Sequence, residues 1–199
     1  MDNSQPEISA RVVIIGKMKV GKTSLVKKFL RDSFSENTEP TVGVLAYPFV
    51  INEFNQKIVV SFCDTAGQEK YRSLGALYYR DSVAAIIVFD LTDLESFEQI
   101  GSWIREYKSY CPTGMIFFAG NKSDLRDDIV VSSTETDELA SKHSTDCIWT
   151  SSFDGTGVKE LFNLVTEFIK QSAIDKINAE ETQIRSLQKK DEVDNRSCC

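Results

Sequence analysis

One segment, residues 16–23, constrains the fold of this chain more than any other. It reads GKMKVGKT, which fits the pattern G-x-x-x-x-G-K-T, and it lies between an apolar run at 11–15 and a helix-like run at 24–30. Glycines allow the backbone to turn tightly and to direct successive N–H groups inward, and the following helix adds the partial positive charge of its N-terminus. This order predicts a phosphate-binding loop. The alternative is a chance pair of glycines in a strand-to-helix turn.

Two side chains at the end of this loop have distinct expected roles. Lys22 is placed to contact the β- and γ-phosphates of a nucleotide, and the Thr23 hydroxyl is placed to hold a Mg²⁺ ion. The loop therefore predicts a nucleoside triphosphate bound together with magnesium. A phosphate-loop kinase or ATPase would share this segment, so the loop alone leaves the base open.

Composition limits the remaining possibilities. The chain has 199 residues, 41% of them hydrophobic and 27% charged, which suits one globular domain at about 10–172 with a flexible segment at 1–9 and a flexible tail at 173–199. The net charge of −7 argues against nucleic acid as the main partner. Five cysteines without C-x-x-C spacing give no support for a zinc knuckle. We expect a cytosolic body, because we find no signal peptide and no apolar run long enough to span a membrane.

Strand-like and helix-like segments alternate along the chain, which predicts an α/β domain. Continuous apolar runs at 83–89 and 115–119 are typical of parallel strands buried on both faces, whereas 44–52 and 57–63 should form an antiparallel hairpin. The remaining expected strands cover 11–16 and 147–150, and the expected helices cover 22–31, 96–107, 133–143 and 157–171. The stretch 32–43 has no period and reads as a long loop.

A second motif follows the hairpin at 64–68, which reads DTAGQ. An aspartate at the end of a strand can hold Mg²⁺ through water, and the Gly67 N–H can reach a terminal phosphate. The Gln68 carboxamide can orient a water molecule for in-line attack on the γ-phosphate. The pattern D-x-x-G is a weak signal by itself, but its position after a phosphate loop strengthens it.

A third motif, NKSD at 121–124, follows the apolar run at 115–119. The Asp124 carboxylate can accept hydrogen bonds from both the guanine N1–H and the exocyclic amine, a pair of donors that adenine lacks. A kinase or ATPase would not need Asn121 or Asp124. The three motifs in this order therefore predict a guanine nucleotide.

From about residue 10 to residue 172 the chain resembles a small GTPase of the Ras superfamily, and among these a Rab protein. The resemblance is carried by DTAGQEKYRSL at 64–74, YYR at 78–80 and IVFDLT at 87–92. It implies a single P-loop NTPase domain of the small G type, with a six-stranded, mostly parallel sheet flanked by about five helices. It also implies GTP hydrolysis with Mg²⁺ and a GTP/GDP-dependent switch that recruits effectors in vesicle trafficking.

The resemblance further assigns roles to single residues. It implies that Thr41 closes over Mg²⁺ and the γ-phosphate and that Phe34 lies across the guanine. Phe153 departs from the family pattern, because it replaces a lysine that packs on the base, and our hypothesis is that its ring stacks there instead. The expected catalytic residues are Gln68, Lys22 and Thr41, and the expected metal residues are Thr23, Thr41 and Asp64. The expected nucleotide-binding residues are Gly16, Lys19, Val20, Gly21, Lys22, Thr23, Ser24, Phe34, Thr41, Gly67, Asn121, Lys122, Asp124, Ser151, Ser152 and Phe153.

Partners and location are also implied by the resemblance. Effectors, an exchange factor, a GTPase-activating protein and a GDP-dissociation inhibitor are expected to contact about 32–46 and 64–80. Prenyl groups are expected on Cys198 and Cys199, which would attach a monomeric protein reversibly to the cytosolic face of endomembranes. The sequence at 82–86 is similar to that of endosomal Rab proteins, which favours an endosomal location. No nucleic-acid partner is expected.

The chain departs from the family pattern at a few positions. Met18 stands where relatives often carry a small residue, and it either crowds Gln68 and slows hydrolysis or points to solvent. The neighbouring Lys19 either touches phosphate or is solvated. Cys63 and Ala46 replace two aromatic residues that effectors of Rab proteins commonly contact, which predicts an unusual set of effectors. The alternative function is a scaffold that binds GTP or GDP with little or no hydrolysis.

Overall fold

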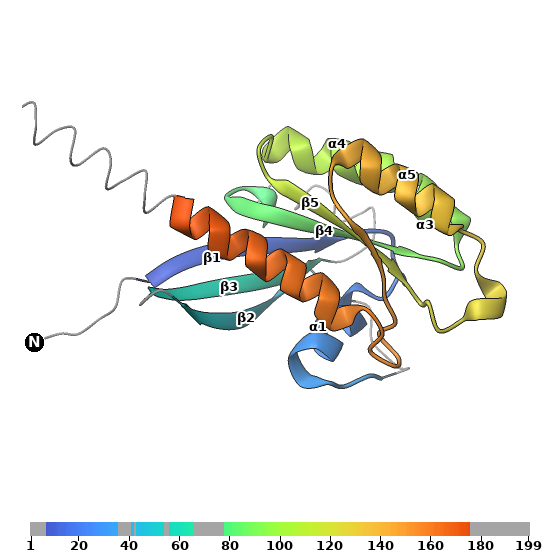
Figure 1. The fold of residues 1–199 in the computed structure, drawn as a ribbon, viewed down its shortest axis with the longest axis horizontal. Coiled ribbons are helices and arrows are strands. Elements are labelled where there is room, and N and C mark those ends of the chain that lie inside the picture. Colours follow the sequence, from blue (N-terminus) through green and yellow to red (C-terminus); the bar gives the residue numbers. More distant parts are fainter. Residues whose placement is uncertain (1–6, 36–40, 42, 54–55, 66–77, 176–199) are drawn as a thin grey trace, which may run out of the picture. The chain divides into compact units, whose positions relative to one another are not determined.

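A computed structural model describes residues 7–35, 41, 43–53, 56–65 and 78–175 of the chain (Figure 1). The chain divides into two compact units, Met1–Val165 and Thr166–Cys199. In the second unit the described residues, 166–175, are helical. The predicted tail at 173–199 lies mostly outside the described residues. The sheet, the remaining helices and the candidate site all belong to the first unit.

The described strands form one six-stranded sheet in the order β2-β3-β1-β4-β5-β6. Only the β2–β3 pair is antiparallel, so the sheet is mostly parallel, as predicted. The strands are β1 (Glu7–Ile15), β2 (Val44–Glu53), β3 (Gln56–Thr65), β4 (Ser82–Asp90), β5 (Met115–Asn121) and β6 (Cys147–Trp149). Because β1, β3, β4, β5 and β6 run in one direction, their carboxyl ends meet at one edge of the sheet.

Helices cover both faces of this sheet. They are α1 (Lys22–Arg31), α3 (Leu94–Glu98), α4 (Ile100–Tyr110), α5 (Ser133–His143) and a helical stretch at 158–165, with a 3-10 turn at Arg126–Asp128. The prediction for α5 is confirmed at both ends. Its start is fixed by a reciprocal cap, in which the Ser132 hydroxyl accepts a hydrogen bond from the Glu135 N–H and the Glu135 carboxylate accepts one from the Ser132 N–H.

The first strand begins earlier than predicted. We expected it to start near Arg11 after a loose segment at 1–9, but β1 includes residues 7–9. Its first residue pairs with the start of β3, where Glu7 lies opposite Lys57 and the two side chains form an ion pair of 2.7 Å. Main-chain pairing with a neighbouring strand stabilises this polar segment, and a pattern of apolar residues does not reveal such pairing.

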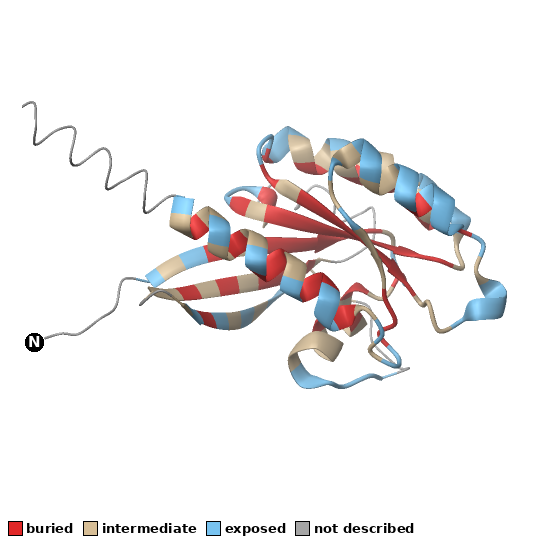
Figure 2. Ribbon diagram, viewed as in Figure 1, coloured by how far each residue is buried: buried red, intermediate tan, exposed pale blue. Residues whose placement is uncertain are grey.

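The interiors of β1, β4 and β5 are buried on both faces, as Figure 2 shows. On one face, Phe162 stacks on Phe29 of α1 with ring centroids 4.1 Å apart and meets the Phe62 ring of β3 edge-on at 5.0 Å. On the opposite face, side chains of α3, α4 and α5 pack against alternate residues of β1 and β4. Trp103 of α4 belongs to this cluster. Because successive side chains of a strand point to opposite faces, the buried middle of each of these strands is a continuous apolar run.

We predict that Phe162→Ala lowers the free energy of unfolding by about 3–5 kcal/mol, because it leaves a cavity between two aromatic rings. Urea unfolding at fixed nucleotide concentration measures the change. Val130→Ala is the matched control, because Val130 is 53% exposed and its truncation should change stability by at most about 0.5 kcal/mol. Equal losses in the two variants would contradict this description of the core.

Candidate functional site

The phosphate loop joins the end of β1 to the start of α1. Its two glycines lie where any side chain would collide with neighbouring atoms. Gly16 has φ 141°, and a Cβ there would lie 2.1 Å from the Val88 carbonyl oxygen of β4. Gly21 has φ 95°, and a Cβ there would lie 2.2 Å from the Asn121 side-chain nitrogen. A side chain is therefore excluded at both positions by backbone conformation and by contact.

Lys22 is the first residue of α1 and its side chain is buried under the loop. Its ammonium donates hydrogen bonds to the carbonyl oxygens of Gly16 at 2.8 Å and Lys17 at 2.9 Å. These bonds hold a positive charge at the centre of a loop whose backbone encloses it. That arrangement can attract the phosphates of a nucleotide.

Three oxygen-bearing side chains from separate segments converge beside this loop. Thr23 donates a hydrogen bond to Asp64 Oδ2 at 2.6 Å, Thr41 donates to the same atom at 3.3 Å, and the two hydroxyl oxygens lie 2.9 Å apart. Asp64 is fully buried, and its Oδ1 atom has no hydrogen-bond partner among the described residues. Burial raises the pKa of the Asp64 carboxyl, while the hydrogen bond from Thr23 and the charge of Lys22 lower it.

This cluster fits a magnesium ion. Mg²⁺ prefers oxygen ligands, and a cation here would satisfy the unpaired Asp64 oxygen and offset the cost of its burial. The described residues contain no group of three or more His, Cys, Asp or Glu side chains that could hold a metal. The predicted metal residues Thr23, Thr41 and Asp64 do lie together. Their hydroxyl and carboxylate oxygens suit Mg²⁺ better than a transition metal.

On the other side of the loop, Asn121 connects three segments. Its side-chain nitrogen donates to the Val20 carbonyl oxygen of the phosphate loop at 2.8 Å. Its Oδ1 accepts hydrogen bonds from the Ser152 N–H at 3.2 Å and the Ser152 hydroxyl at 3.1 Å. Asn121 is buried, so these bonds form away from water and fix the phosphate loop relative to the loop after β6.

The predicted base-reading residues lie at the same edge of the sheet. Asp124 is half-buried, and its Oδ1 accepts a hydrogen bond from the Ser151 hydroxyl at 2.6 Å. Lys122 has a left-handed backbone with φ 67° and forms an ion pair with the Asp90 carboxylate at the end of β4. We did not predict a role for Asp90. The available signal was its position directly after the apolar run at 83–89, and in the structure it lies opposite Asn121 in the β4–β5 register.

The variable positions of the phosphate loop differ in their surroundings. Met18 is 40% exposed and Lys19 is exposed with φ 68°, while Val20 is buried. Lys17 forms ion pairs with Asp93 at 2.8 Å and Glu95 at 2.7 Å, a connection to α3 that the sequence motifs did not indicate. The hydrogen bond from Lys17 lowers the pKa of the Asp93 carboxyl. The loop is thereby connected to α3 through Lys17.

For several predicted residues the structure shows no contact with the phosphate loop or the metal cluster, or does not describe the residue. Ser24 lies half-buried in the first turn of α1, and Phe34 and Phe153 are exposed and contact each other. Gly67, Gln68, Cys198 and Cys199 lie outside the described residues, as do parts of the expected partner surfaces at 32–46 and 64–80. The geometry therefore brings together the phosphate, metal and base residues, and it leaves the hydrolytic and lipidation predictions untested.

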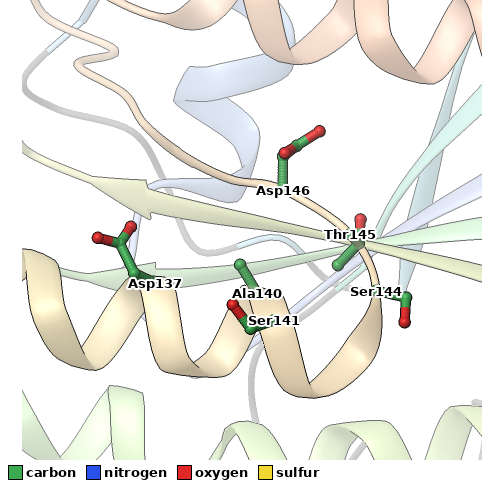
Figure 3. A pocket seen from close by; sticks show the side chains of 6 residues that line it. All are labelled: Asp137, Ala140, Ser141, Ser144, Thr145 and Asp146. Carbon is green, nitrogen blue, oxygen red and sulfur yellow. The ribbon is translucent and has the colours of Figure 1, made fainter.

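A pocket of about 430 Å³ lies elsewhere in the first unit (Figure 3). Its lining comes from the second half of α5 and the segment that leads to β6, and consists of Asp137, Ala140, Ser141, Ser144, Thr145 and Asp146. None of these residues belongs to the predicted site, so the candidate site does not coincide with this pocket. Within the described part of the chain, no helix has the length and apolar character that crossing a membrane requires.

Known proteins are similar in sequence to this chain over most of its length. A sequence model of the Ras family matches residues 11–171. Ras-related protein RABF2a of Arabidopsis thaliana is 38% identical over 156 residues, which cover 78% of this chain and 78% of that protein. GTP-binding protein ypt3 of Schizosaccharomyces pombe is 36% identical over 156 residues, 78% of this chain and 73% of that protein. Ras-related protein Rab-21 of Geodia cydonium is 38% identical over 159 residues, 79% of this chain and 69% of that protein.

These matches agree with the geometry of the phosphate, metal and base residues. They do not favour a scaffold without hydrolysis, and a protein of this kind interacts with effectors, exchange factors and GTPase-activating proteins. The chain belongs to the Ras family and is a Rab-type small GTPase, an enzyme that binds GTP or GDP with Mg²⁺, hydrolyses GTP and acts as a nucleotide-dependent switch in membrane trafficking.

Proposed function

We propose that the residues predicted from the sequence carry out this activity in a domain at about 10–172, and that the hydrolytic step is slow. The observation that supports these roles most strongly is the convergence of Thr23, Thr41 and Asp64 beside the buried Lys22 ammonium. The phosphates would contact the loop at 16–23, and the base would contact Asn121, Lys122, Asp124 and residues 151–153.

The protein groups in this proposal bind, orient and exclude water. Lys22 and the loop N–H groups hold the phosphates, while Thr23, Thr41 and Asp64 hold the metal. A bound Mg²⁺ ion would neutralise charge on the phosphate oxygens. Gln68 orients the attacking water molecule. Asp124 discriminates guanine from adenine because its carboxylate accepts two hydrogen bonds from guanine that adenine cannot donate.

Switching follows from the position of Thr41. This residue ends a long segment after α1, and in the structure its hydroxyl lies against Thr23 and Asp64. When the γ-phosphate is present, Thr41 and Gly67 would both be held at the site, and loss of that phosphate would release them. The surface at 32–46 and 64–80 would then change, and effectors would distinguish the two states.

The effector surface of this chain differs from that of common Rab proteins. Ala46 of β2 is exposed and lies opposite Cys63 of β3, which is buried. These two small side chains occupy positions where relatives commonly carry aromatic rings. We propose that effectors of this protein contact a flatter surface here, with Tyr78 as the retained aromatic residue. A GDP-dissociation inhibitor would contact the same two segments.

We predict that Met18→Gly raises the single-turnover rate of GTP hydrolysis roughly three- to tenfold, which corresponds to about 0.7–1.4 kcal/mol of barrier. The proposed reason is that the flexible Met18 side chain, which is 40% exposed, crowds Gln68 or an incoming activator and so slows hydrolysis. Phosphate release from preloaded protein measures the rate. Met18→Leu is the control, because it keeps the volume and should stay slow. An unchanged rate in Met18→Gly would show that Met18 points harmlessly to solvent.

We also predict that membrane attachment requires Cys198 and Cys199. Two prenyl chains give stable binding to a bilayer, whereas one chain gives marginal, reversible binding. In cells, the double variant Cys198→Ser/Cys199→Ser should move from the membrane fraction to the supernatant, and Cys198→Ser alone should divide between them. Retained nucleotide binding shows that the variants are folded. A double variant that stays on membranes would refute lipidation at these positions. We also propose an endosomal location, from the sequence at 82–86, and co-localisation of the unchanged protein with endosomal markers tests it.

A further inference from the structure

The side chain of Lys17, in the phosphate loop, contacts the start of α3. Its ammonium donates hydrogen bonds to Asp93 Oδ2 at 2.8 Å and to Glu95 Oε2 at 2.7 Å. The Lys17 side chain is only 22% exposed, and that of Asp93 is 35% exposed. One cation therefore meets two carboxylates at a place partly withdrawn from water, where salt screens an ion pair less than at a fully exposed surface.

The backbone of Lys17 contacts the residue that is proposed to bind phosphate. The Lys17 carbonyl oxygen accepts a hydrogen bond from the buried Lys22 ammonium at 2.9 Å. A continuous chain of contacts thus runs from two carboxylates of α3, through the side chain and backbone of Lys17, to Lys22. A displacement of Lys17 would therefore move an acceptor that holds the phosphate-binding ammonium.

The turn that carries the two carboxylates is fixed by its own hydrogen bonds. The Ser96 hydroxyl donates to the Asp93 carbonyl oxygen at 2.7 Å and accepts from the Asp90 N–H at 2.9 Å. Asp90 Oδ1 accepts hydrogen bonds from the Thr92 N–H at 2.9 Å and from the Thr92 hydroxyl at 2.7 Å. Bonds of this kind between side chains and nearby backbone stabilise a turn without a ligand. The turn can therefore act as a fixed support for the loop.

The same turn also contacts the base side of the proposed site. Asp90 forms an ion pair with Lys122, which follows β5 and is proposed to contact the base. Asp93, three residues later, forms its ion pair with Lys17 of the phosphate loop. Lysines from two separate loops of the site are thus paired with carboxylates of one short turn, residues 90–95. This turn supports the phosphate loop and the base loop together.

The contacts of Lys17 distinguish two roles that a lysine in a phosphate loop could have. It could add its charge directly to the binding of phosphate, or it could hold the loop in place. Two carboxylates within hydrogen-bond distance already neutralise this charge. The geometry therefore favours the second role.

We propose that Lys17 is a positioning residue, whose ion pairs with Asp93 and Glu95 anchor the phosphate loop to α3 and slow the release of the nucleotide. The inference rests on the proposed nucleotide-binding roles and adds to them a residue that acts without touching the ligand. Because partly exposed ion pairs contribute modest free energies, loss of this anchor should accelerate release by about 2- to 5-fold.

The test is the dissociation rate of a fluorescent GDP analogue from the full-length protein in excess Mg²⁺. Lys17→Met removes the charge but keeps a long side chain, and it should release the analogue faster. Asp93→Asn/Glu95→Gln removes both carboxylates and should accelerate release to a similar extent. Adding Lys17→Met to that double variant should give no further acceleration, because the ion pairs are already lost. Lys17→Arg keeps the charge and should release at the wild-type rate.

Salt and a second ion pair provide the controls. Raising the NaCl concentration screens the ion pairs, so the difference in rate between the wild type and Lys17→Met should shrink. Lys57 forms an ion pair of 2.7 Å with Glu7 where β1 and β3 begin, at the opposite end of these strands from the site. Lys57→Met should therefore release the analogue at the wild-type rate.

The outcomes separate the anchor from the proposed binding roles. Slower release from Asp93→Asn/Glu95→Gln would show that the freed Lys17 charge binds phosphate directly, and it would overturn the anchor. A wild-type rate in Lys17→Met, or effects that multiply in the combined variant, would also overturn it while leaving nucleotide binding intact. A wild-type protein that fails to retain GDP would overturn the proposed binding roles, and the anchor with them. Coupled acceleration that shrinks with salt supports the proposal.

Discussion

The rest of the site depends on one buried carboxylate, that of Asp64. It lies at the end of β3 and accepts hydrogen bonds from Thr23 of α1 and Thr41 of the segment that precedes β2. A buried carboxylate with an unpaired oxygen is costly unless a cation or further donors offset it. We infer that this cost is what makes the cluster a metal site, and that the metal in turn makes the position of Thr41 sensitive to the nucleotide.

Asn121 provides the second constraint, because it joins the phosphate loop to the loop after β6. Its side chain contacts Val20 and Ser152, so the phosphate side and the base side keep a fixed separation. The parallel strands make this possible, since β1, β4 and β5 deliver their last residues to the same edge of the sheet. We infer that the phosphates of the nucleotide lie at the first of these loops and the guanine at the second. In the proposed mechanism, the contacts of Asn121 stay in place while Thr41 responds to the γ-phosphate.

Much of this could be predicted from the sequence, where local chemistry decides the structure. The glycines at 16 and 21, the helix at 133–143 and the apolar run at 83–89 each depend on local backbone preferences or on simple burial, and each prediction was confirmed. Other contacts between distant segments were not predicted, because no motif indicated them. The pairing of Lys17 with Asp93 depends on how α3 meets the loop, and residues 7–9 join β1 only because β3 lies beside them. Neither leaves a pattern along the chain.

Magnesium dependence of nucleotide release tests the central claim most directly. A fluorescent GDP analogue is released from full-length protein in excess Mg²⁺ and again after chelation with EDTA, in the wild type and in Asp64→Asn. We predict that chelation accelerates release strongly in the wild type. The Asp64→Asn variant should release quickly under both conditions, because the carboxylate that anchors the metal is gone. Equal wild-type rates with and without Mg²⁺, or an unchanged magnesium effect in Asp64→Asn, would contradict a metal site organised by Asp64.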